Sequence, residues 1–323
     1  MGALAAAGPF RAEAFSNFPL SSFILYFERV HFRKITLIGV GLLGGSLGLA
    51  IKKRRLADKI EGYVRRAGSV EECRKFGVVD RATRDLSGAV DGADLVILCT
   101  PLAQMRELTE QMLPALKRGA VVTDVGSVKA SVIDQLQPLF EKTRAHFVGS
   151  HPMAGAEKIG VSAARADLFE NAVCLVTPRP SSNEAAVQCV GDFWQNIGGR
   201  VIKMTPEMHD DFVSRSSHLP HVVAAELANY VLSPVHPREQ AMLCANGFRD
   251  TTRIASGSPE MWRDIALANR KNLARVLGVF IEDLQEFSLA LEHNDVRAIE
   301  EFFEQAKHRR DAWHAQNASS SPE

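Results

Sequence analysis

The sequence lacks cysteines spaced as metal ligands or as a redox motif. Its five cysteines are odd in number and widely separated, with no CxxC and no Cys/His ligand pattern. This spacing argues against a disulfide framework and against a structural zinc site. We therefore expect free thiols and a cytoplasmic protein.

The chain also lacks an excess of charge and a long apolar run. Lys plus Arg and Asp plus Glu each number 38, so the formal net charge is zero and favours neither nucleic acid nor an anionic membrane. Residues 18–27 are apolar but contain two serines and are followed by Glu28. Such a stretch is too short for a membrane span and is a poor signal peptide. We expect residues 1–32 to be a loosely ordered extension.

The 323 residues suffice for about two domains. In the first part, apolar runs typical of buried strands alternate with helical patterns. The expected strands are 35–40, 60–64, 94–101, 120–125, 145–148, 172–176 and 200–203, and the expected helices are 41–51, 70–76, 105–116, 131–143 and 184–196. This alternation predicts an α/β domain over residues 33–205, built on a Rossmann-type, doubly wound, mostly parallel sheet.

After Pro206 the strand patterns stop. Apolar residues recur at three- and four-residue intervals and predict helices at 207–232, 238–244, 261–292 and 296–314. We therefore expect an all-helical domain over 206–315 and a polar tail over 316–323. Because these helices carry more than one apolar face, they require a partner surface.

A glycine-rich loop joins the first expected strand to the first expected helix. Gly39, Gly41 and Gly44 form a complete GxGxxG around Leu42 and Leu43. In this position the glycines allow a tight turn, a close approach to a pyrophosphate and close helix–strand packing. The helix N-terminus supplies N–H groups and partial positive charge for phosphates. We predict a dinucleotide site.

The end of the second expected strand bears on which dinucleotide binds. NAD sites usually place a carboxylate there, which binds the ribose 2′-hydroxyl. This chain has Val64 followed by Arg65 and Arg66. Two guanidinium groups suit a 2′-phosphate, so NADP is favoured. NAD remains possible if both arginines are simply solvated.

Polar residues follow other strands at the edge where ligands bind in such folds. Thr100 and Pro101 follow one strand, and Ser127 and Lys129 follow the next. Ser127 can donate to a substrate oxygen, whereas Lys129 is equally well explained as a solvated lysine at a helix start.

His151 stands among small residues in the segment GSHPMAGAEKIG, just after residues 145–148. That position suits a proton-transfer group at the carboxyl edge of the sheet, although a lone histidine is more often structural. Downstream, His218 and His221 lie one helical turn apart. No further ligand completes a metal set with them, so we expect no metal.

The segment GFRDTTRIASGSPEMW carries two arginines and a tryptophan. One guanidinium, from Arg249 or Arg253, can bind a carboxylate bidentately. Trp262 is of a type that usually lies in a core. The remaining histidines are interpreted as surface or structural residues, namely His146, His209, His236 and His293.

Together these segments resemble the prephenate/arogenate dehydrogenase family of tyrosine biosynthesis. The motifs GVGLLGGSLGLA, TDVGSVK, GSHPMAGAEKIG, SHLPH and GFRDTTRIASGSPEMW occur in the family's order and extend over residues 35 to about 310. The resemblance implies oxidative decarboxylation of a cyclohexadienol. A hydride passes to a nicotinamide, the hydroxyl proton passes to a base, and loss of CO2 makes the ring aromatic.

The resemblance also implies roles for individual residues. His151 is the acceptor of the ring hydroxyl proton and Ser127 assists in its placement. Arg253 binds a substrate carboxylate, His221 lines the pocket near substrate and nicotinamide, and Trp262 shapes that pocket. The helical domain forms a homodimer.

This chain departs from the family pattern at two positions. Val64 replaces a common acidic residue, and Asn246 stands where many relatives have glycine, next to the substrate side-chain pocket. The product is 4-hydroxyphenylpyruvate from prephenate, or tyrosine from arogenate. A carboxylate aimed at the side chain, such as Glu157 or Asp250, favours arogenate. Two alternatives are another 3-hydroxyacid-dehydrogenase-like enzyme and a non-catalytic dinucleotide sensor.

Overall fold

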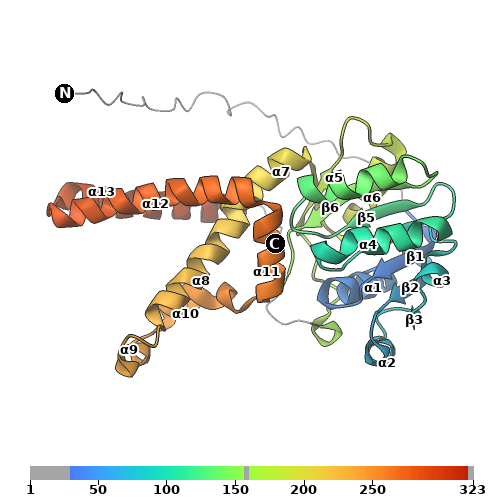
Figure 1. Ribbon diagram of the computed structural model, residues 1–323, viewed down its shortest axis with the longest axis horizontal. Helices are drawn as coiled ribbons and strands as arrows, with labels where there is room; N and C mark the ends of the chain where they lie inside the picture. Colours follow the sequence, from blue (N-terminus) through green and yellow to red (C-terminus); the bar gives the residue numbers. More distant parts are fainter. Residues whose placement is uncertain (1–29, 156–159, 319–323) are drawn as a thin grey trace.

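A computed structural model describes residues 30–155 and 160–318. These residues form one half built on a sheet and one half built of helices (Figure 1). Most of the expected N-terminal extension and the last residues of the expected tail lie outside the described residues. Phe32 already belongs to the first strand, and the last helix continues to Ala318.

The sheet has eight strands in the order β3-β2-β1-β4-β5-β6-β7-β8. All neighbouring pairs are parallel except β6 and β7. The strands are β1 (Phe32–Ile38), β2 (Ala57–Tyr63), β3 (Arg81–Thr83), β4 (Leu95–Leu98), β5 (Val121–Asp124), β6 (His146–Pro152), β7 (Val173–Thr177) and β8 (Arg200–Lys203). The chain order reverses between β1 and β4, which creates a crevice at their carboxyl ends.

Helices cover both faces of this sheet and close a separate apolar core on each. One core includes residues of α1, α2 and α6, and the other includes residues of α3, α4 and α5. These helices are α1 (Leu42–Arg54), α2 (Ala67–Phe76), α3 (Leu86–Val90), α4 (Leu102–Met112), α5 (Ala130–Phe140) and α6 (Glu184–Ile197). The predicted fold class is confirmed.

The sheet half also holds short elements that the apolar pattern did not indicate. β3 and α3 are three and five residues long, and 3-10 turns occur at η1 (Leu113–Ala115) and η2 (Val161–Ala163). The strand expected to end at residue 148 continues to Pro152. It pairs with β5 up to Val148 and then with antiparallel β7 from Gly149. His151 is therefore held within a strand.

The second half begins at Pro206 and is helical. Its elements are α7 (Pro206–Val213), the π-helical turn η3 (Ser214–His218), α8 (Leu219–Val231), α9 (Arg238–Met242), α10 (Asn246–Thr252), the 3-10 turn η4 (Arg253–Ser256), α11 (Pro259–Ala268), α12 (Arg270–Glu292) and α13 (Val296–Ala318). The paired helices α12 and α13 extend away from the sheet (Figure 1). In the described part of the chain, no helix has the length and apolar character needed to cross a membrane.

Two helices expected to be continuous are interrupted. The segment 207–232 contains the π-helical turn η3 just before Pro220, a residue that has no N–H for the helical hydrogen-bond ladder. The segment 261–292 breaks at Asn269, whose backbone is non-helical and whose buried side chain bonds to other elements. The polar stretch at 246–252, which lies outside the helices expected from the sequence, is α10.

Candidate active site

The loop after β1 has the geometry of a phosphate cradle. Gly39 has a φ of +94°, which favours glycine. A Cβ on Gly44 would lie 2.1 Å from the Gly39 carbonyl oxygen, whereas a Cβ on Gly41 would meet nothing within 4 Å. Gly41 precedes α1 and no side chain caps that helix. The loop therefore combines tight packing at two glycines with open space at the third, in front of unsatisfied helix N–H groups.

The end of β2 presents positive charge and no carboxylate. Val64 is buried, and Arg65 and Arg66 are exposed just before α2. A third arginine lies beside them, because Arg84 Nε donates to the carbonyl oxygen of Arg65 at 3.1 Å.

Two segments line the carboxyl edge next to this loop. Thr100 follows β4, and its buried Oγ1 has no hydrogen-bond partner within the described part of the chain. Pro101 is exposed and precedes α4. Ser127 is half-buried between β5 and α5, and its backbone lies beside the ring of His218. The crevice is thus bordered by the glycine-rich loop after β1 and by polar groups from the connections after β4 and β5.

Lys129 is not a solvated lysine. Its side chain and that of Asp124 are both 0% exposed and form an ion pair, and Lys129 Nζ also donates to the carbonyl oxygen of Ser150 at 2.8 Å. Burial lowers the pKa of Lys129, while Asp124 acts in the opposite direction. The interpretation as a surface residue was wrong because α7 covers the start of α5.

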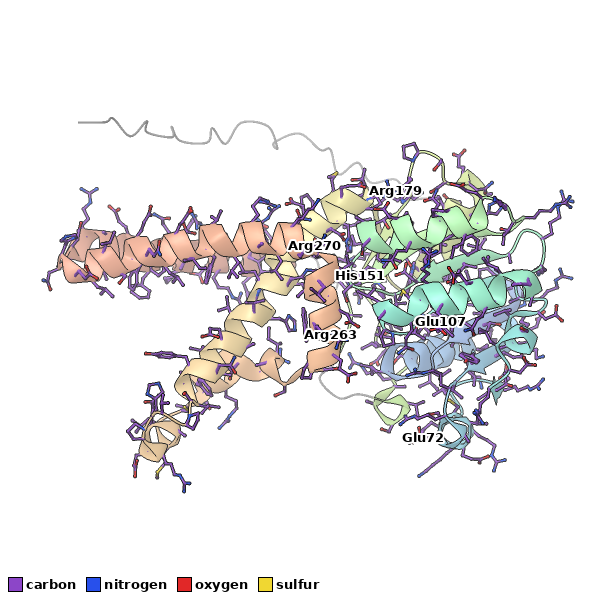
Figure 2. All side chains as sticks on the ribbon, viewed as in Figure 1. Glu72, Glu107, His151, Arg179, Arg263 and Arg270 are labelled. Carbon is purple, nitrogen blue, oxygen red and sulfur yellow. The ribbon has the colours of Figure 1, made fainter. Side chains whose placement is uncertain are left out.

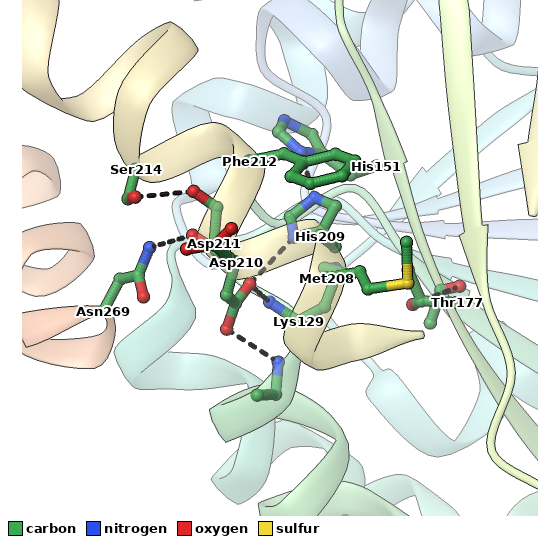
Figure 3. A network of polar contacts seen from close by, with 12 residues as sticks. Lys129, His151, Thr177, Met208, His209, Asp210, Asp211, Phe212, Ser214 and Asn269 are labelled. Carbon is green, nitrogen blue, oxygen red and sulfur yellow. Dashed lines mark hydrogen bonds and ion pairs between the residues drawn. The ribbon is translucent and has the colours of Figure 1, made fainter. Parts of the chain in front are cut away.

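His151 lies where the sheet half meets the helical half (Figure 2). It is 8% exposed, and its Nδ1 lies 2.9 Å from Nε2 of His209 (Figure 3). Burial lowers the pKa of His151 well below its ordinary value, and the nearby His209, Lys129 and His218 act in the same direction. The ring is therefore neutral near pH 7 and able to accept a proton.

His209, interpreted from the sequence as a surface or structural residue, lies against His151. It is fully buried in α7, and its Nδ1 lies 2.8 Å from Oδ1 of Asp210. Asp210 in turn accepts the backbone N–H groups of Lys129 at 2.7 Å and Ala130 at 3.0 Å. α7 thus carries two residues of the helical half to the start of α5 and to His151.

A cavity of about 410 Å³ lies among the helices, and its wall includes His218, His221, Val222, Ile254, Trp262 and Leu273. The rings of His221 and Trp262 stack with centroids 3.7 Å apart. Burial lowers the pKa of both histidines, in His218 to about 4. Trp262 lines this cavity and is not a core residue.

The remaining predicted substrate residues, Arg253 and Asn246, lie outside the wall of this cavity. Arg253 is exposed at the start of η4, directly before Ile254. Asn246 is exposed at the start of α10, where its Oδ1 accepts from Arg249 at 3.4 Å. Neither residue is part of the cavity wall. Of the two candidate carboxylates, Asp250 is exposed on α10 and Glu157 lies outside the described residues.

Two family models match the chain, one over most of the sheet half and one over most of the helical half. Residues 47–203 match the model of the prephenate dehydrogenase nucleotide-binding domain, and residues 205–305 match that of the prephenate dehydrogenase dimerization domain. The chain belongs to the prephenate dehydrogenase family. The resemblance drawn from the motifs is confirmed.

Curated members of the prephenate dehydrogenase family are similar over most of the chain. Cyclohexadienyl dehydrogenase of Zymomonas mobilis subsp. mobilis is 36% identical over 288 residues, which cover 86% of this chain and 95% of that protein. Prephenate dehydrogenase of Bacillus subtilis is 37% identical over 284 residues, which cover 86% of this chain and 75% of that protein.

Solved structures in the prephenate dehydrogenase family share the whole architecture. The Aquifex aeolicus prephenate dehydrogenase, in complex with hydroxyphenyl propionate and NAD+, superposes with a TM-score of 0.82 at 30% identity, covering 88% of this chain and 99% of that chain. The Synechocystis arogenate dehydrogenase gives a TM-score of 0.73 at 29% identity, covering 87% and 99%.

Sequence patterns did not indicate that His209 lies against His151, that Asp210 bonds His209, or that Lys129 is buried nearby. His209 and Asp210 lie in an expected helix and Lys129 lies just before one, and their burial depends on the docking of α7 against α5 and β6. Among the described residues, no group of three or more His, Cys, Asp and Glu side chains is arranged to hold a metal.

Proposed function

We propose that this protein is a nicotinamide-dependent dehydrogenase that converts prephenate to 4-hydroxyphenylpyruvate with loss of CO2. The observation that carries the proposal is His151, a buried neutral histidine at the junction of the dinucleotide crevice and the helical half. Family membership supports the reaction class.

The residues of the crevice fit a nicotinamide dinucleotide. The backbone of Gly39, Gly41, Leu42, Leu43 and Gly44 would hold the pyrophosphate, since a Cβ on Gly41 would occupy otherwise open space at the start of α1. Thr100 and Pro101 would border the nicotinamide end, where the Thr100 hydroxyl is a buried group in need of a partner. A bound nicotinamide would supply the acceptor for the hydride of the ring carbon.

NADP is the cofactor that we propose. Arg65 and Arg66 follow the buried Val64, and Arg84 adds a third guanidinium group. No carboxylate stands at Val64 to bind a 2′-hydroxyl, whereas guanidinium groups bind a 2′-phosphate through charge-assisted hydrogen bonds.

His151 takes the proton of the ring hydroxyl as the hydride leaves. A ring alcohol does not ionise at neutral pH, so transfer of its proton must accompany the loss of hydride. Burial keeps the pKa of His151 low and the ring unprotonated. Ser127, between β5 and α5, assists by holding the hydroxyl.

The substrate carboxylates need a cation that stays charged, which Arg253 supplies. We place the ring of the substrate between His151 and the helical cavity, with His221 and Trp262 at its other side. Stacking on Trp262 fixes the plane of His221. Asn246 borders the pocket for the side chain.

Arogenate is a second candidate substrate, favoured by the hydrogen bond of His221. Its Nδ1 donates to the Ser217 carbonyl oxygen at 2.9 Å, and burial lowers the pKa of the ring. Nε2 is then an acceptor on a ring that lines the cavity. An acceptor suits the ammonium of arogenate better than the keto group of prephenate.

The protein acts as a homodimer formed through its helical half. Large apolar side chains are strongly exposed there, including Val235, Met242, Leu243 and Val296. Exposed apolar surface of this kind marks an interface, and a dimerization-domain model matches the same residues. Sedimentation equilibrium is expected to give twice the chain mass of 35.4 kDa. A monomer at micromolar concentration would contradict the assignment.

The proposed function is tested by measuring kcat/KM for both substrates with both cofactors, from the rise in absorbance at 340 nm. We expect turnover of prephenate with NADP faster than with NAD. Arogenate turnover at a comparable rate supports dual specificity. Absence of turnover in all four combinations overturns the proposal.

A further inference from the structure

Three side chains form a continuous buried chain that ends on the proposed base. His151 Nδ1 contacts His209 Nε2 at 2.9 Å, and His209 Nδ1 contacts Asp210 Oδ1 at 2.8 Å. All three are at most 8% exposed. His151 comes from the sheet half and the other two come from α7 (Figure 3).

The Asp210 carboxylate fixes the direction of these hydrogen bonds. It accepts backbone N–H groups of Lys129 and Ala130 at the N-terminus of the eleven-residue helix α5, a position that stabilises negative charge. An ionised carboxylate only accepts, so His209 must carry a hydrogen on Nδ1. In a neutral His209, Nε2 then accepts and His151 must donate from Nδ1.

The charge state of His209 decides whether this arrangement holds. Burial lowers the pKa of His209, and Lys129 adds to this effect, while Asp210 and the more distant Asp124 oppose it. The charged or titratable groups facing the two rings are therefore Lys129, Asp124, Asp210 and His218. A protonated His209 would donate from both nitrogens and force His151 to carry its own hydrogen on Nε2.

We propose, on the basis of the dehydrogenase function above, that His209 and Asp210 are positioning residues that hold His151 as the Nδ1–H tautomer. The Nε2 lone pair of His151 is then available to accept the proton of the substrate hydroxyl. An isolated imidazole has both tautomers open to it, and the hydrogen bond at one nitrogen selects the proton position at the other. The pair therefore acts through His151 without touching the substrate.

The first test reads the tautomer directly and needs no substrate. The full chain is labelled with 15N-histidine, and long-range 1H–15N spectra are recorded near pH 7. The signals of His151 are assigned by their loss in His151→Asn. We expect a protonated Nδ1 and an unprotonated Nε2. A hydrogen on Nε2 of His151 overturns the proposal, even if the protein proves to be an active dehydrogenase.

The second test compares two replacements of His209. In His209→Gln the side-chain oxygen can still accept from His151 Nδ1, whereas His209→Phe keeps a ring without an acceptor. We expect His209→Phe to lower kcat by about 10- to 100-fold, the range for removing a group that orients a functional histidine, and to shift His151 toward Nε2–H. His209→Gln should retain most of the activity and the Nδ1–H signal.

A matched control is His146→Gln, at the other end of the same strand and outside the crevice. It should leave kcat and the His151 signal unchanged. Equal losses of kcat in His209→Gln and His209→Phe, with the tautomer unchanged in both, indicate a purely structural role and overturn the proposal. If His209→Phe does not fold, the wild-type spectrum and the activity and spectrum of His209→Gln still test the proposal. Loss of the Nδ1–H signal of His151 in His209→Gln also contradicts the proposal.

Discussion

Lys129 and Asp124 form an ion pair in which neither side chain is exposed. The Asp124 carboxylate also accepts the N–H groups of Gly126 at 2.8 Å and Ser150 at 3.1 Å. The pair thereby ties the end of β5 to the strand that carries His151.

Lys129→Met is expected to lower the free energy of unfolding by about 3–5 kcal/mol, because it leaves a buried carboxylate without its counter-charge. The double variant Lys129→Met/Asp124→Asn removes both charges and should recover part of the loss. Urea titration followed by circular dichroism measures both. A single variant as stable as the wild type would show that the pair does not support the site.

Replacement by alanine should have different effects at Gly48, within α1, and at Gly41, which precedes that helix. A Cβ on Gly48 would lie 2.0 Å from the backbone oxygen of Val78, whereas Gly41 faces open space. Gly48→Ala should therefore destabilise the fold by about 1–3 kcal/mol through overpacking. Gly41→Ala should leave stability unchanged and weaken NADP binding about tenfold or more, by keeping the pyrophosphate from charge-assisted hydrogen bonds.

Thermal melts and fluorescence titration with NADP separate these two effects. A Gly48→Ala protein as stable as the wild type contradicts the packing assigned to α1. A Gly41→Ala protein with unchanged NADP affinity contradicts the geometry assigned to the loop.

Replacing Arg66 by alanine should lower kcat/KM with NADP about 10- to 100-fold, because a charge-assisted hydrogen bond to the 2′-phosphate is worth about 1.5–3 kcal/mol. The value with NAD should change little. Arg74→Ala is the control, since Arg74 is exposed on the same helix and pairs with Glu71. Equal losses with both cofactors would remove Arg66 from the 2′-phosphate site.

The pH dependence of kcat/KM follows from the buried histidines. Burial lowers the pKa of His151, so the unprotonated base persists as pH falls below the ordinary histidine value of about 6.5. The acid limb of the profile should therefore have an apparent pKa below about 6.5. Initial rates between pH 4.5 and pH 8 test this expectation in buffers of constant ionic strength. An acid limb well above pH 7 would contradict a neutral, buried base.

Much of this fold could be predicted from local patterns in the sequence. Long apolar runs such as residues 94–101 mark fully buried strands, and GxGxxG between a strand and a helix marks the crevice. β3 was missed because three residues carry too little periodicity. The break at Asn269 was missed because its cause is a buried hydrogen bond to the Asp210 carbonyl oxygen, a contact between distant segments.

For the site, the sequence indicates a candidate where a residue type suggests its chemistry, as with His151 in its glycine-flanked segment. His209 and Lys129 carry no such signal. Their burial depends on how α7 docks against the sheet half, and a helical pattern predicts which face is apolar but not which polar side chains another element covers.

The central claim, that His151 is the base of the reaction, is tested most directly by comparing kcat of His151→Asn with that of His146→Asn, a histidine on the same strand but outside the crevice. With saturating prephenate and NADP, the account predicts a fall of ~10²–10⁴ for His151→Asn, the range for loss of a general base. The affinity for NADP should be unchanged, and His146→Asn should match the wild type. A His151→Asn enzyme that turns over prephenate at the wild-type rate would contradict the account.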